Sequence, residues 1–308
     1  MGAVWDLLTT EVIYESAVRF AALLLFAACG EWVAERAGTL NISVEGMLLS
    51  GAFAAAVSID LVDSMWLALL AGALAGLVVS LVQANLSHRL PADQFVVGLT
   101  LNILVLGLVG FLDTAIEPSV SRAGVVEIPV LSSIPLIGGA LFAQTWPLYL
   151  VYGLVPLCWW LVYRTRWGLE VRAAGEDPNA ADVSGIHVNK RRRQTIYLAG
   201  LTSGLGGAYL VLGVIGSFAD SVIGGRGFIA IAAVIFGGWT LKGTVAGCLL
   251  FGAVLSFRLS LPEAGYESVN TELLQALPYI VTIVGMAIFA HRVRPPAALT
   301  RPFLRGLK

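Results

Sequence analysis

The feature that most constrains this chain is a succession of apolar stretches, each close to the length that crosses a lipid bilayer. A membrane-spanning helix needs about 20 mostly apolar residues. Scanning on that basis predicts about nine spans, near residues 12–30, 41–59, 64–84, 93–116, 146–163, 195–214, 227–240, 243–257 and 274–290. We therefore predict an all-α, polytopic bundle of transmembrane helices, with roughly eight to ten spans.

Composition favours a membrane protein over a soluble one. Hydrophobic residues make up 57% of the 308 residues, charged residues make up 13%, and the mean hydropathy is +0.83. A soluble domain of this length needs more charge to cover its surface. The net charge of −1 lacks the basic excess of a phosphate-binding surface, so no nucleic-acid partner is expected. No low-complexity linker divides the chain, and we expect residues 1–308 to form one transmembrane domain.

Two of the predicted spans, 227–240 and 243–257, are shorter than a usual bilayer crossing, and glycines interrupt them. Broken or re-entrant helices are expected there, because irregular backbone at membrane depth is tolerated where it lines a cavity. A second glycine-containing break, "RAGTLNISVEG" at 36–46, lies in the first half of the chain. One break in each half is what two related halves would produce.

Basic residues gather in two segments and predict the orientation. Of the 19 Lys and Arg residues, seven lie in the loop 164–193 and five in the tail 292–308. Cytoplasmic loops carry an excess of such residues, so both segments should face the cytoplasm. The acidic loop 261–272, the loop 117–145 and the acidic N-terminal segment then lie outside. This gives an N-terminus outside and a C-terminus in the cytoplasm.

The predicted cytoplasmic loop contains the polar stretch "GEDPNAADVSGI" at 175–186. Asp177 is a good helix N-cap, Pro178 suits the first helical position, and Gly185 can take the left-handed conformation that ends a helix. A short capped helix is a rigid knob, suited to docking into a cleft of another protein. The alternative is an ordinary solvated loop whose bases, Lys190 to Arg193, set the topology or meet anionic lipid.

Several long segments resemble one known family. They are "RTRWGLEVRAAGEDPNAADVSGIHVNKRR" (164–192), "GLGGAYL" (204–210) and "GRGFIAIAAVIFGGW" (225–239). They resemble the permease subunits of bacterial ATP-binding-cassette (ABC) importers of the branched-chain amino acid, ribose and nucleoside group. "GEWVAERAGTLNISVEGMLLSGAFAA" (30–55) and "ADQFVVGLTLNIL" (92–104) look most like the nucleoside and simple-sugar permeases that work with a basic-membrane-protein-type lipoprotein.

The resemblance implies a coupling role for the polar stretch and a set of partners. Residues 175–186 would be the coupling helix that contacts the ATPase, with interface residues Gly175, Glu176, Asp177, Pro178, Asn179, Asp182 and Gly185. The implied partners are ABC ATPase subunits, a related but non-identical second permease, and an extracytoplasmic solute-binding lipoprotein. The implied location is the bacterial inner membrane.

Motifs for catalysis or nucleotide binding are missing from the sequence. No G-x-x-x-x-G-K-[ST] loop occurs, so the energy for transport must come from a partner or from an ion gradient. The resemblance implies that a partner ATPase uses ATP-Mg, and we expect this chain to be a non-catalytic subunit without a bound cofactor or metal. The glycines at 204, 206 and 207 follow no strand, so close helix packing is expected of them. The three cysteines lie far apart in apolar runs and are expected to be small buried hydrophobes.

Polar side chains within the spans are candidates for lining a solute path. Neutral ones can hydrogen-bond the hydroxyls of a sugar, and Phe228 can stack on a base or ribose face. Glu45 would face a polar cavity if the helix is broken at "NIS", and otherwise lies in a first helical turn. Each also has a structural interpretation, as a hydrogen bond between helices or as packing. The candidate residues are Asn41, Ser43, Glu45, Gln94, Asn102 and Phe228.

Two functions of different class follow from these features. The preferred one is the permease subunit of an ATP-driven importer that moves a nucleoside or simple sugar inward by alternating access. The alternative is a self-sufficient secondary carrier or facilitator for a small neutral solute, in which residues 175–193 form only a basic loop.

Overall fold

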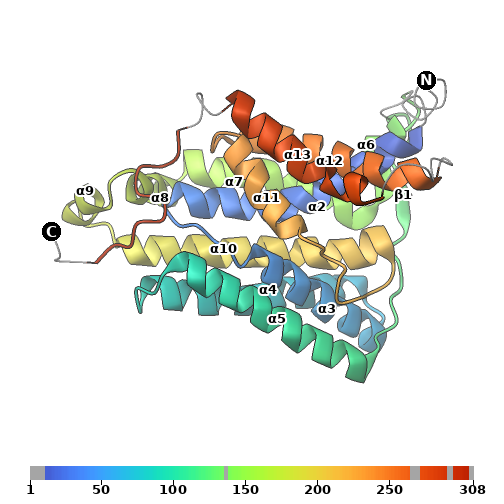
Figure 1. The fold of residues 1–308 in the computed structure, drawn as a ribbon, viewed down its shortest axis with the longest axis horizontal. Helices are drawn as coiled ribbons and strands as arrows, with labels where there is room; N and C mark the ends of the chain where they lie inside the picture. Colours follow the sequence, from blue (N-terminus) through green and yellow to red (C-terminus); the bar gives the residue numbers. More distant parts are fainter. Residues whose placement is uncertain (1–10, 135–137, 264–270, 290–293, 305–308) are drawn as a thin grey trace.

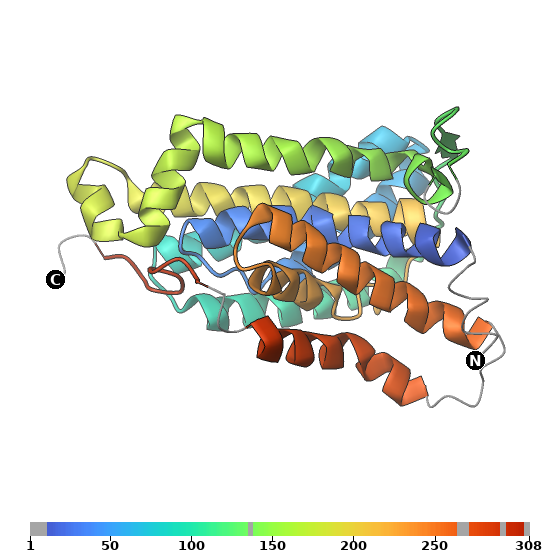
Figure 2. The same cartoon turned by 90° about the horizontal axis from the view of Figure 1, so that it is seen from above.

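The computed structural model describes residues 11–134, 138–263, 271–289 and 294–304, and most of them are helical. The long helices are α2 (Glu11–Arg36), α3 (Val44–Val62), α4 (Met65–His88), α5 (Gln94–Ile116), α7 (Tyr149–Arg164), α10 (Val188–Tyr209), α12 (Leu241–Glu263) and α13 (Thr271–Phe289). They run side by side as a bundle, with the hairpin strand β1 at one end and helix α9 at the other (Figures 1 and 2). The predicted all-α polytopic bundle is confirmed.

In the described part of the chain, seven helical segments are long and apolar enough to cross a membrane. They are Glu11–Arg36, Val44–Val62, Met65–His88, Gln94–Ile116, Trp146–Arg164, Val188–Ile215 and Leu241–Ser260. Two other predicted spans correspond to shorter apolar helices, Arg226–Phe236 (α11) and Ala276–Gly285 within α13. The acidic loop 261–272 falls largely outside the described residues.

The expectation of a short or broken helix at 243–257 is wrong. Helix α12 is continuous over 23 residues, from Leu241 to Glu263. Gly243 lies in its first turn and does not interrupt it, and the helix continues past Arg258, where polar side chains end the apolar pattern. Helix α11 is the short one, with 11 residues from Arg226 to Phe236.

The loop 117–145 contains a small hairpin that the sequence did not predict. Strands β1 (Val125–Glu127) and β2 (Ala143–Thr145) pair antiparallel, and the five-residue helix α6 (Gly138–Phe142) lies between them. Helix α6 is far too short to add a span. After β2, the 3₁₀ turn η1 (Trp146–Leu148) leads into α7.

The hairpin region covers a π-helical turn at the end of α10, η2 (Leu210–Ile215). A π turn leaves carbonyl groups without their usual helical partners. The N–H of Ala123 donates to the Leu212 carbonyl at 2.8 Å, and the Thr145 hydroxyl donates to the Gly213 carbonyl at 3.2 Å. The loop 117–145 is thereby attached to the end of α10.

Three helices meet where each contributes a glycine: Gly51 of α3, Gly72 of α4 and Gly204 of α10. A Cβ atom added to Gly204 would lie 2.3 Å from the Gly72 carbonyl oxygen, and one added to Gly51 would lie 2.3 Å from the Gly204 carbonyl oxygen. Without side chains, the backbones approach closely and gain packing contacts that hold helices together inside a membrane. The predicted packing role of the α10 glycines is confirmed.

Replacing Gly204 with Ala should therefore lower the apparent melting temperature of the detergent-solubilised chain. The added methyl group overlaps a neighbouring backbone, and overpacking of this kind costs about 1–3 kcal/mol. Gly153→Ala in α7 is the matched control, because a Cβ there meets nothing within 4 Å. Equal melting temperatures for the two variants would contradict the close contact.

Candidate functional site

The chain is not helical between α2 and α3, over residues 37–43, which we call the first break. The N–H of Asn41 donates to Glu31 Oε1 at 3.0 Å, and the N–H of Leu40 donates to Gln94 Oε1 at 2.9 Å. Backbone groups removed from water must find partners within the protein. Side chains from α2 and α5 supply these partners, so the first break is a fixed part of the structure.

Asn102 of α5 holds the beginning of α3. Its amide nitrogen donates to the Ile42 carbonyl at 2.8 Å, and its amide oxygen accepts from the Gly46 N–H at 2.8 Å. Gly98, one turn earlier on α5, permits this close approach, since a Cβ there would lie 2.6 Å from Ile42 Cβ. Both hydrogen-bonding functions of Asn102 are therefore used in joining α5 to α3.

Glu45 joins α3 to the second break, residues 216–225, which precedes α11. One carboxylate oxygen accepts from the Gly225 N–H and the other from the Gly227 N–H, each at 2.7 Å. Glu45 lies in the first turn of α3, and both amides belong to the beginning of α11. Helix N-termini carry a partial positive charge. A single carboxylate thus stabilises the ends of two helices.

A cavity of ≈ 460 Å³ lies against Glu45 and Asn102. Its walls come from α3, α5, the second break and α11. The lining residues are Glu45, Gly46, Leu49, Leu99, Asn102, Ile103, Leu106, Asp220, Ser221, Ile223, Gly224, Gly225 and Phe228. The cavity thus combines a largely apolar wall with two carboxylates, an amide, a hydroxyl and an aromatic ring, and its volume lies in the usual range for small-molecule sites.

Of the candidate path residues, the structure brings Glu45, Asn102 and Phe228 to this cavity. The other three do not line it. Asn41, Ser43 and Gln94 are buried behind it, where the Ser43 hydroxyl donates to Asn41 Oδ1 at 2.8 Å. These three polar side chains maintain the shape of the first break.

Two buried carboxyl groups, Glu31 and Glu35, lie one turn apart on α2 and were not among the predicted site residues. Both are 0% exposed. Trp239, in the turn between α11 and α12, donates its indole N–H to Glu35 and accepts the indole N–H of Trp32 at its own carbonyl, at 2.8 Å. The pair thus attaches the first break, through Glu31, and the α11–α12 turn, through Glu35, to one helix. The sequence signal that could have identified this pair is the presence of two acidic residues four positions apart in an apolar stretch.

At the opposite end from the hairpin, α8 (Arg166–Glu176) and α9 (Pro178–Val183) form the predicted cytoplasmic segment. Asp177 caps α9, accepting from the N–H groups of Asn179 and Ala180 at 3.0 Å each. Pro178 occupies the first helical position, and Gly185 has φ +89°. The predicted short, capped helix is confirmed, down to its first and last positions.

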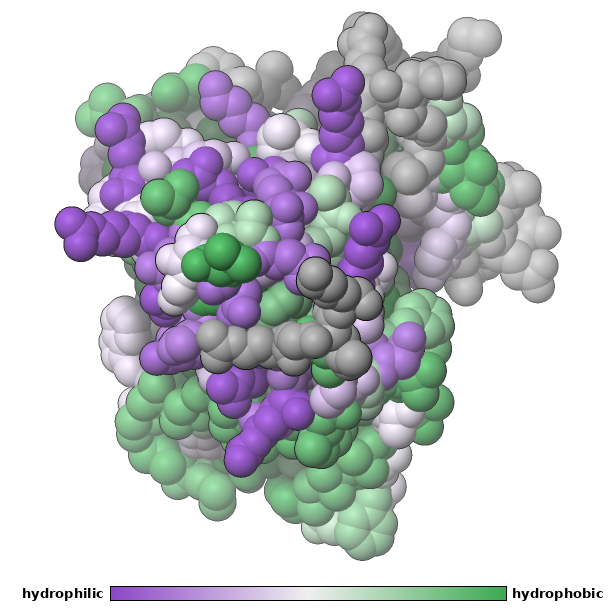
Figure 3. Space-filling model, turned by 90° about the vertical axis from the view of Figure 1, so that its left-hand side faces the viewer, coloured by the Kyte–Doolittle hydropathy of each residue, from purple (hydrophilic) through white to green (hydrophobic). Residues whose placement is uncertain are grey.

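Helix α9 presents polar and apolar groups together at this end of the molecule. Figure 3 looks onto it and shows hydrophilic residues gathered across the face. Among the interface candidates, Glu176, Asp177, Asn179 and Gly185 are exposed, Pro178 and Asp182 are partly exposed, and Gly175 is buried. Val183, at the end of α9, is 90% exposed. The apolar side chain of Val183 is therefore accessible to any protein that covers α9.

The basic run after α9 is not simply a solvated face, because Arg192 is 0% exposed. Its guanidinium donates to four carbonyl oxygens: Ala37 at 3.1 Å, Ala174 at 3.5 Å, Ala298 at 3.4 Å and Arg301 at 2.7 Å. Arginine suits this place because its planar group presents five donors. Arg192 is therefore not a solvated or lipid-facing base, and it joins the first break, α8 and the C-terminal tail.

These features define a class of protein: a polytopic membrane protein with broken helices around a solute-sized cavity and a capped helix exposed at one end, the architecture of a transport permease. A family model described as "Branched-chain amino acid transport system / permease component" matches residues 13–286. The chain belongs to this family of ABC transporter permeases.

Three curated relatives match this chain over nearly their whole length. The nucleoside ABC transporter permease protein NupC of Lactococcus lactis is 34% identical, over 94% of this chain and 96% of the relative. The guanosine ABC transporter permease protein NupQ of Bacillus subtilis is 34% identical, over 96% and 97%. A putative glucose ABC transporter permease protein of Haloferax volcanii is 31% identical, over 96% and 98%.

Replacing Glu45 with Ala should lower the apparent melting temperature in detergent, because two N–H groups at the start of α11 lose their acceptor. Hydrogen bonds to charged groups contribute about 1.5–3 kcal/mol each. Glu45→Gln keeps one acceptor oxygen and should lose about half as much. Glu127→Ala, an exposed position on β1, is the control. A Glu45→Ala variant that melts like the control would contradict the bridging role.

Proposed function

We propose that this permease carries a nucleoside or simple sugar into the cell by alternating access, driven by a separate ATPase that docks on residues 175–186. The main support for this proposal is the structure of α9. It is a short helix, capped at both ends, that holds the largely exposed Val183 away from the bundle. A helix of six residues has little stability of its own. Building and capping one outside the membrane is explained by a protein partner that binds it.

The lining of the cavity suits an uncharged solute better than an anionic one. Glu45 and Asp220 give its lining two carboxylates, and no Lys or Arg is among the described lining residues. A site of one sign of charge disfavours solutes of the same sign. Ser221 offers a hydroxyl that can bond a solute hydroxyl, and Phe228, 41% exposed, offers an aromatic face. The names of the relatives, which include nucleoside, guanosine and glucose permeases, agree with such a solute.

The remaining partners follow from the same proposal. The chain pairs with a second, related permease, receives solute from an extracytoplasmic binding lipoprotein, and itself binds neither ATP-Mg nor another cofactor. Helix α9 and the tail 294–304 lie at one end of the bundle, with the hairpin 125–145 at the other (Figure 1). The end that contains α9 and the tail carries most of the basic residues of 164–193. We therefore place this end in the cytoplasm, with the N-terminus outside the plasma membrane.

The family assignment favours this function over a self-sufficient secondary carrier. The two functions are separated by reconstitution into vesicles, with and without the co-purified ATPase, second permease and binding lipoprotein. We expect ATP-dependent uptake of radiolabelled guanosine only with the full set of subunits. Gradient-driven uptake by this chain alone would overturn the proposal.

The double variant Asp177→Ala/Pro178→Ala should reduce ATP-dependent uptake by about tenfold or more and lower ATPase recovery in a detergent pull-down. Loss of an N-cap costs about 1 kcal/mol, which is enough to unfold an isolated turn but not the bundle. The melting temperature should therefore stay close to that of the wild type. Arg166→Ala, an exposed position on α8, is the control. Wild-type ATPase recovery with the double variant would contradict docking on α9.

Phosphorylated solutes should compete poorly. In the reconstituted importer, guanosine monophosphate should inhibit guanosine uptake far less than unlabelled adenosine does, because its phosphate meets Glu45 and Asp220. Asp220→Asn removes one of the two negative charges and should reduce the difference in inhibition between guanosine monophosphate and adenosine. Equal inhibition by the two competitors in the wild type would contradict a cavity that disfavours anionic solutes.

A further inference from the structure

The C-terminal tail, residues 294–304, packs into the base of the coupling segment. The Ala298 N–H donates to the Gly175 carbonyl at 2.9 Å, and the Asn189 side chain donates to the Phe303 carbonyl at 3.2 Å. The Phe303 ring belongs to a small buried cluster with Ala174, Ala181 and Val188. The tail is therefore attached to α8, α9 and α10 by both polar and apolar contacts.

The buried Arg192 fixes the position of this tail from within. Two of its four acceptors, the carbonyls of Ala298 and Arg301, belong to the tail, and the other two belong to Ala37 and Ala174. Hydrogen bonds from a charged donor are stronger than neutral ones, and Arg192 is removed from solvent. The tail is thus held against the first break and α8 by a buried group that no partner protein can touch.

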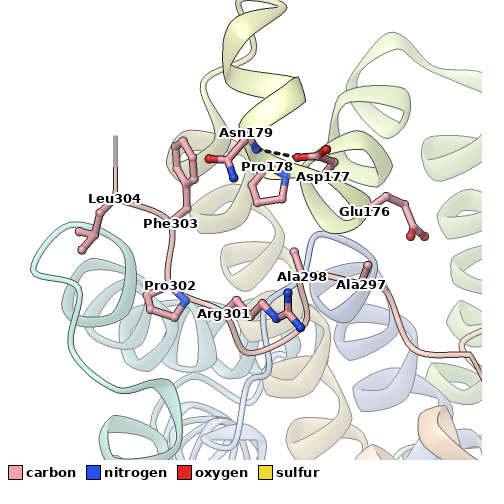
Figure 4. A pocket seen from close by; sticks show the side chains of 10 residues that line it. All are labelled: Glu176, Asp177, Pro178, Asn179, Ala297, Ala298, Arg301, Pro302, Phe303 and Leu304. Carbon is pink, nitrogen blue, oxygen red and sulfur yellow. Dashed lines mark hydrogen bonds between the residues drawn. The ribbon is translucent and has the colours of Figure 1, made fainter. Parts of the chain in front are cut away.

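Between α9 and the tail lies a cavity of ≈ 480 Å³ (Figure 4). One wall is Glu176 to Asn179, the beginning of the coupling helix. The other wall belongs to the tail and consists of Ala297, Ala298, Arg301, Pro302, Phe303 and Leu304. We propose that the tail residues that line this cavity are part of the ATPase-docking surface and that the cavity receives a side chain of the ATPase subunit.

The proposal rests on the proposed function, in which the ATPase binds α9. Asp177, Pro178 and Asn179 are at once coupling-helix residues and cavity walls. A partner that covers the beginning of α9 therefore also meets the tail. Leu304, 41% exposed on the tail, matches the exposed Val183 on α9 as a second apolar contact.

The lining indicates what kind of side chain enters. Glu176 and Asp177 bring two carboxylates to the helix wall, and Arg301 brings one guanidinium to the tail wall. One carboxylate oxygen of Asp177 is already occupied by the N–H groups of Asn179 and Ala180. The remaining carboxylate oxygens are acceptors. A long side chain of the ATPase that donates hydrogen bonds, such as Lys, Arg or Gln, fits this place, with its stem along Phe303 and Pro302.

The test fills the cavity without changing α9. Ala297→Trp places a large ring in it, and Thr300→Trp is the matched control, an exposed position on the same tail outside the lining. Binding of the purified ATPase to each detergent-solubilised chain is measured beside Asp177→Ala. We expect Ala297→Trp to weaken binding by about tenfold or more, since a steric block within a protein interface acts strongly. Thr300→Trp should bind as the wild type does.

The outcomes separate this inference from the function on which it rests. Normal binding by Ala297→Trp, with weak binding by Asp177→Ala, overturns the docking role of the tail and leaves the function standing. A wild-type chain that binds no ATPase overturns the function itself.

If Ala297→Trp lowers the melting temperature, weaker binding could come from a disturbed fold, and a cross-linking experiment then tests the proposal. The three native cysteines are buried, so a cysteine introduced by Leu304→Cys is the accessible thiol. A short thiol-to-amine cross-linker should join this variant, but not the wild type, to the ATPase. An absent cross-link in a complex that still assembles overturns the proposal.

Discussion

The carboxylate of Glu45 is the contact on which the interior of this permease depends. Two helices, α3 and α11, begin inside the bundle, and each leaves N–H groups at its first turn without helical partners. Where water is absent, such groups are costly. Glu45 belongs to one of these helices and accepts hydrogen bonds from the beginning of the other. Since Asn102 fastens the same turn of α3 to α5, the cavity beside them is framed by side chains that first satisfy the backbone.

The fold was largely predictable from the sequence, because membrane-spanning helices can be recognised by their length and their apolar composition. The caps of α9 were also predictable, since Asp177, Pro178 and Gly185 act through local backbone geometry. The small hairpin was not, because its strands are three residues each and are set by contacts with the distant π turn of α10. The continuity of α12 was missed for a related reason: polar residues near Arg258 end the apolar pattern but not the helix.

The sequence predicted the type of residue that forms the site, but not which of these residues line the cavity. Polar residues near the two breaks were the right group to consider, yet only the three-dimensional arrangement separates Glu45 and Asn102, which line the cavity, from Asn41, which supports it. Arg192 shows the limit most clearly. Its neighbours in sequence are basic and polar, and nothing local distinguishes it. Its role comes from four carbonyls contributed by the first break, α8 and the tail, segments far apart along the chain.

The glycine contact among α3, α4 and α10 also bears on how the protein can move. Where backbone touches backbone, no side chain lies between the helices to change rotamer, and sliding one helix over another would bring atoms into overlap. These three helices therefore form a stationary frame. Helices α5 and α11 are attached to that frame at its centre by hydrogen bonds of Asn102 and Glu45, which can open and close again. Any change in the width of the cavity therefore comes from a movement of α5 or α11 relative to this frame.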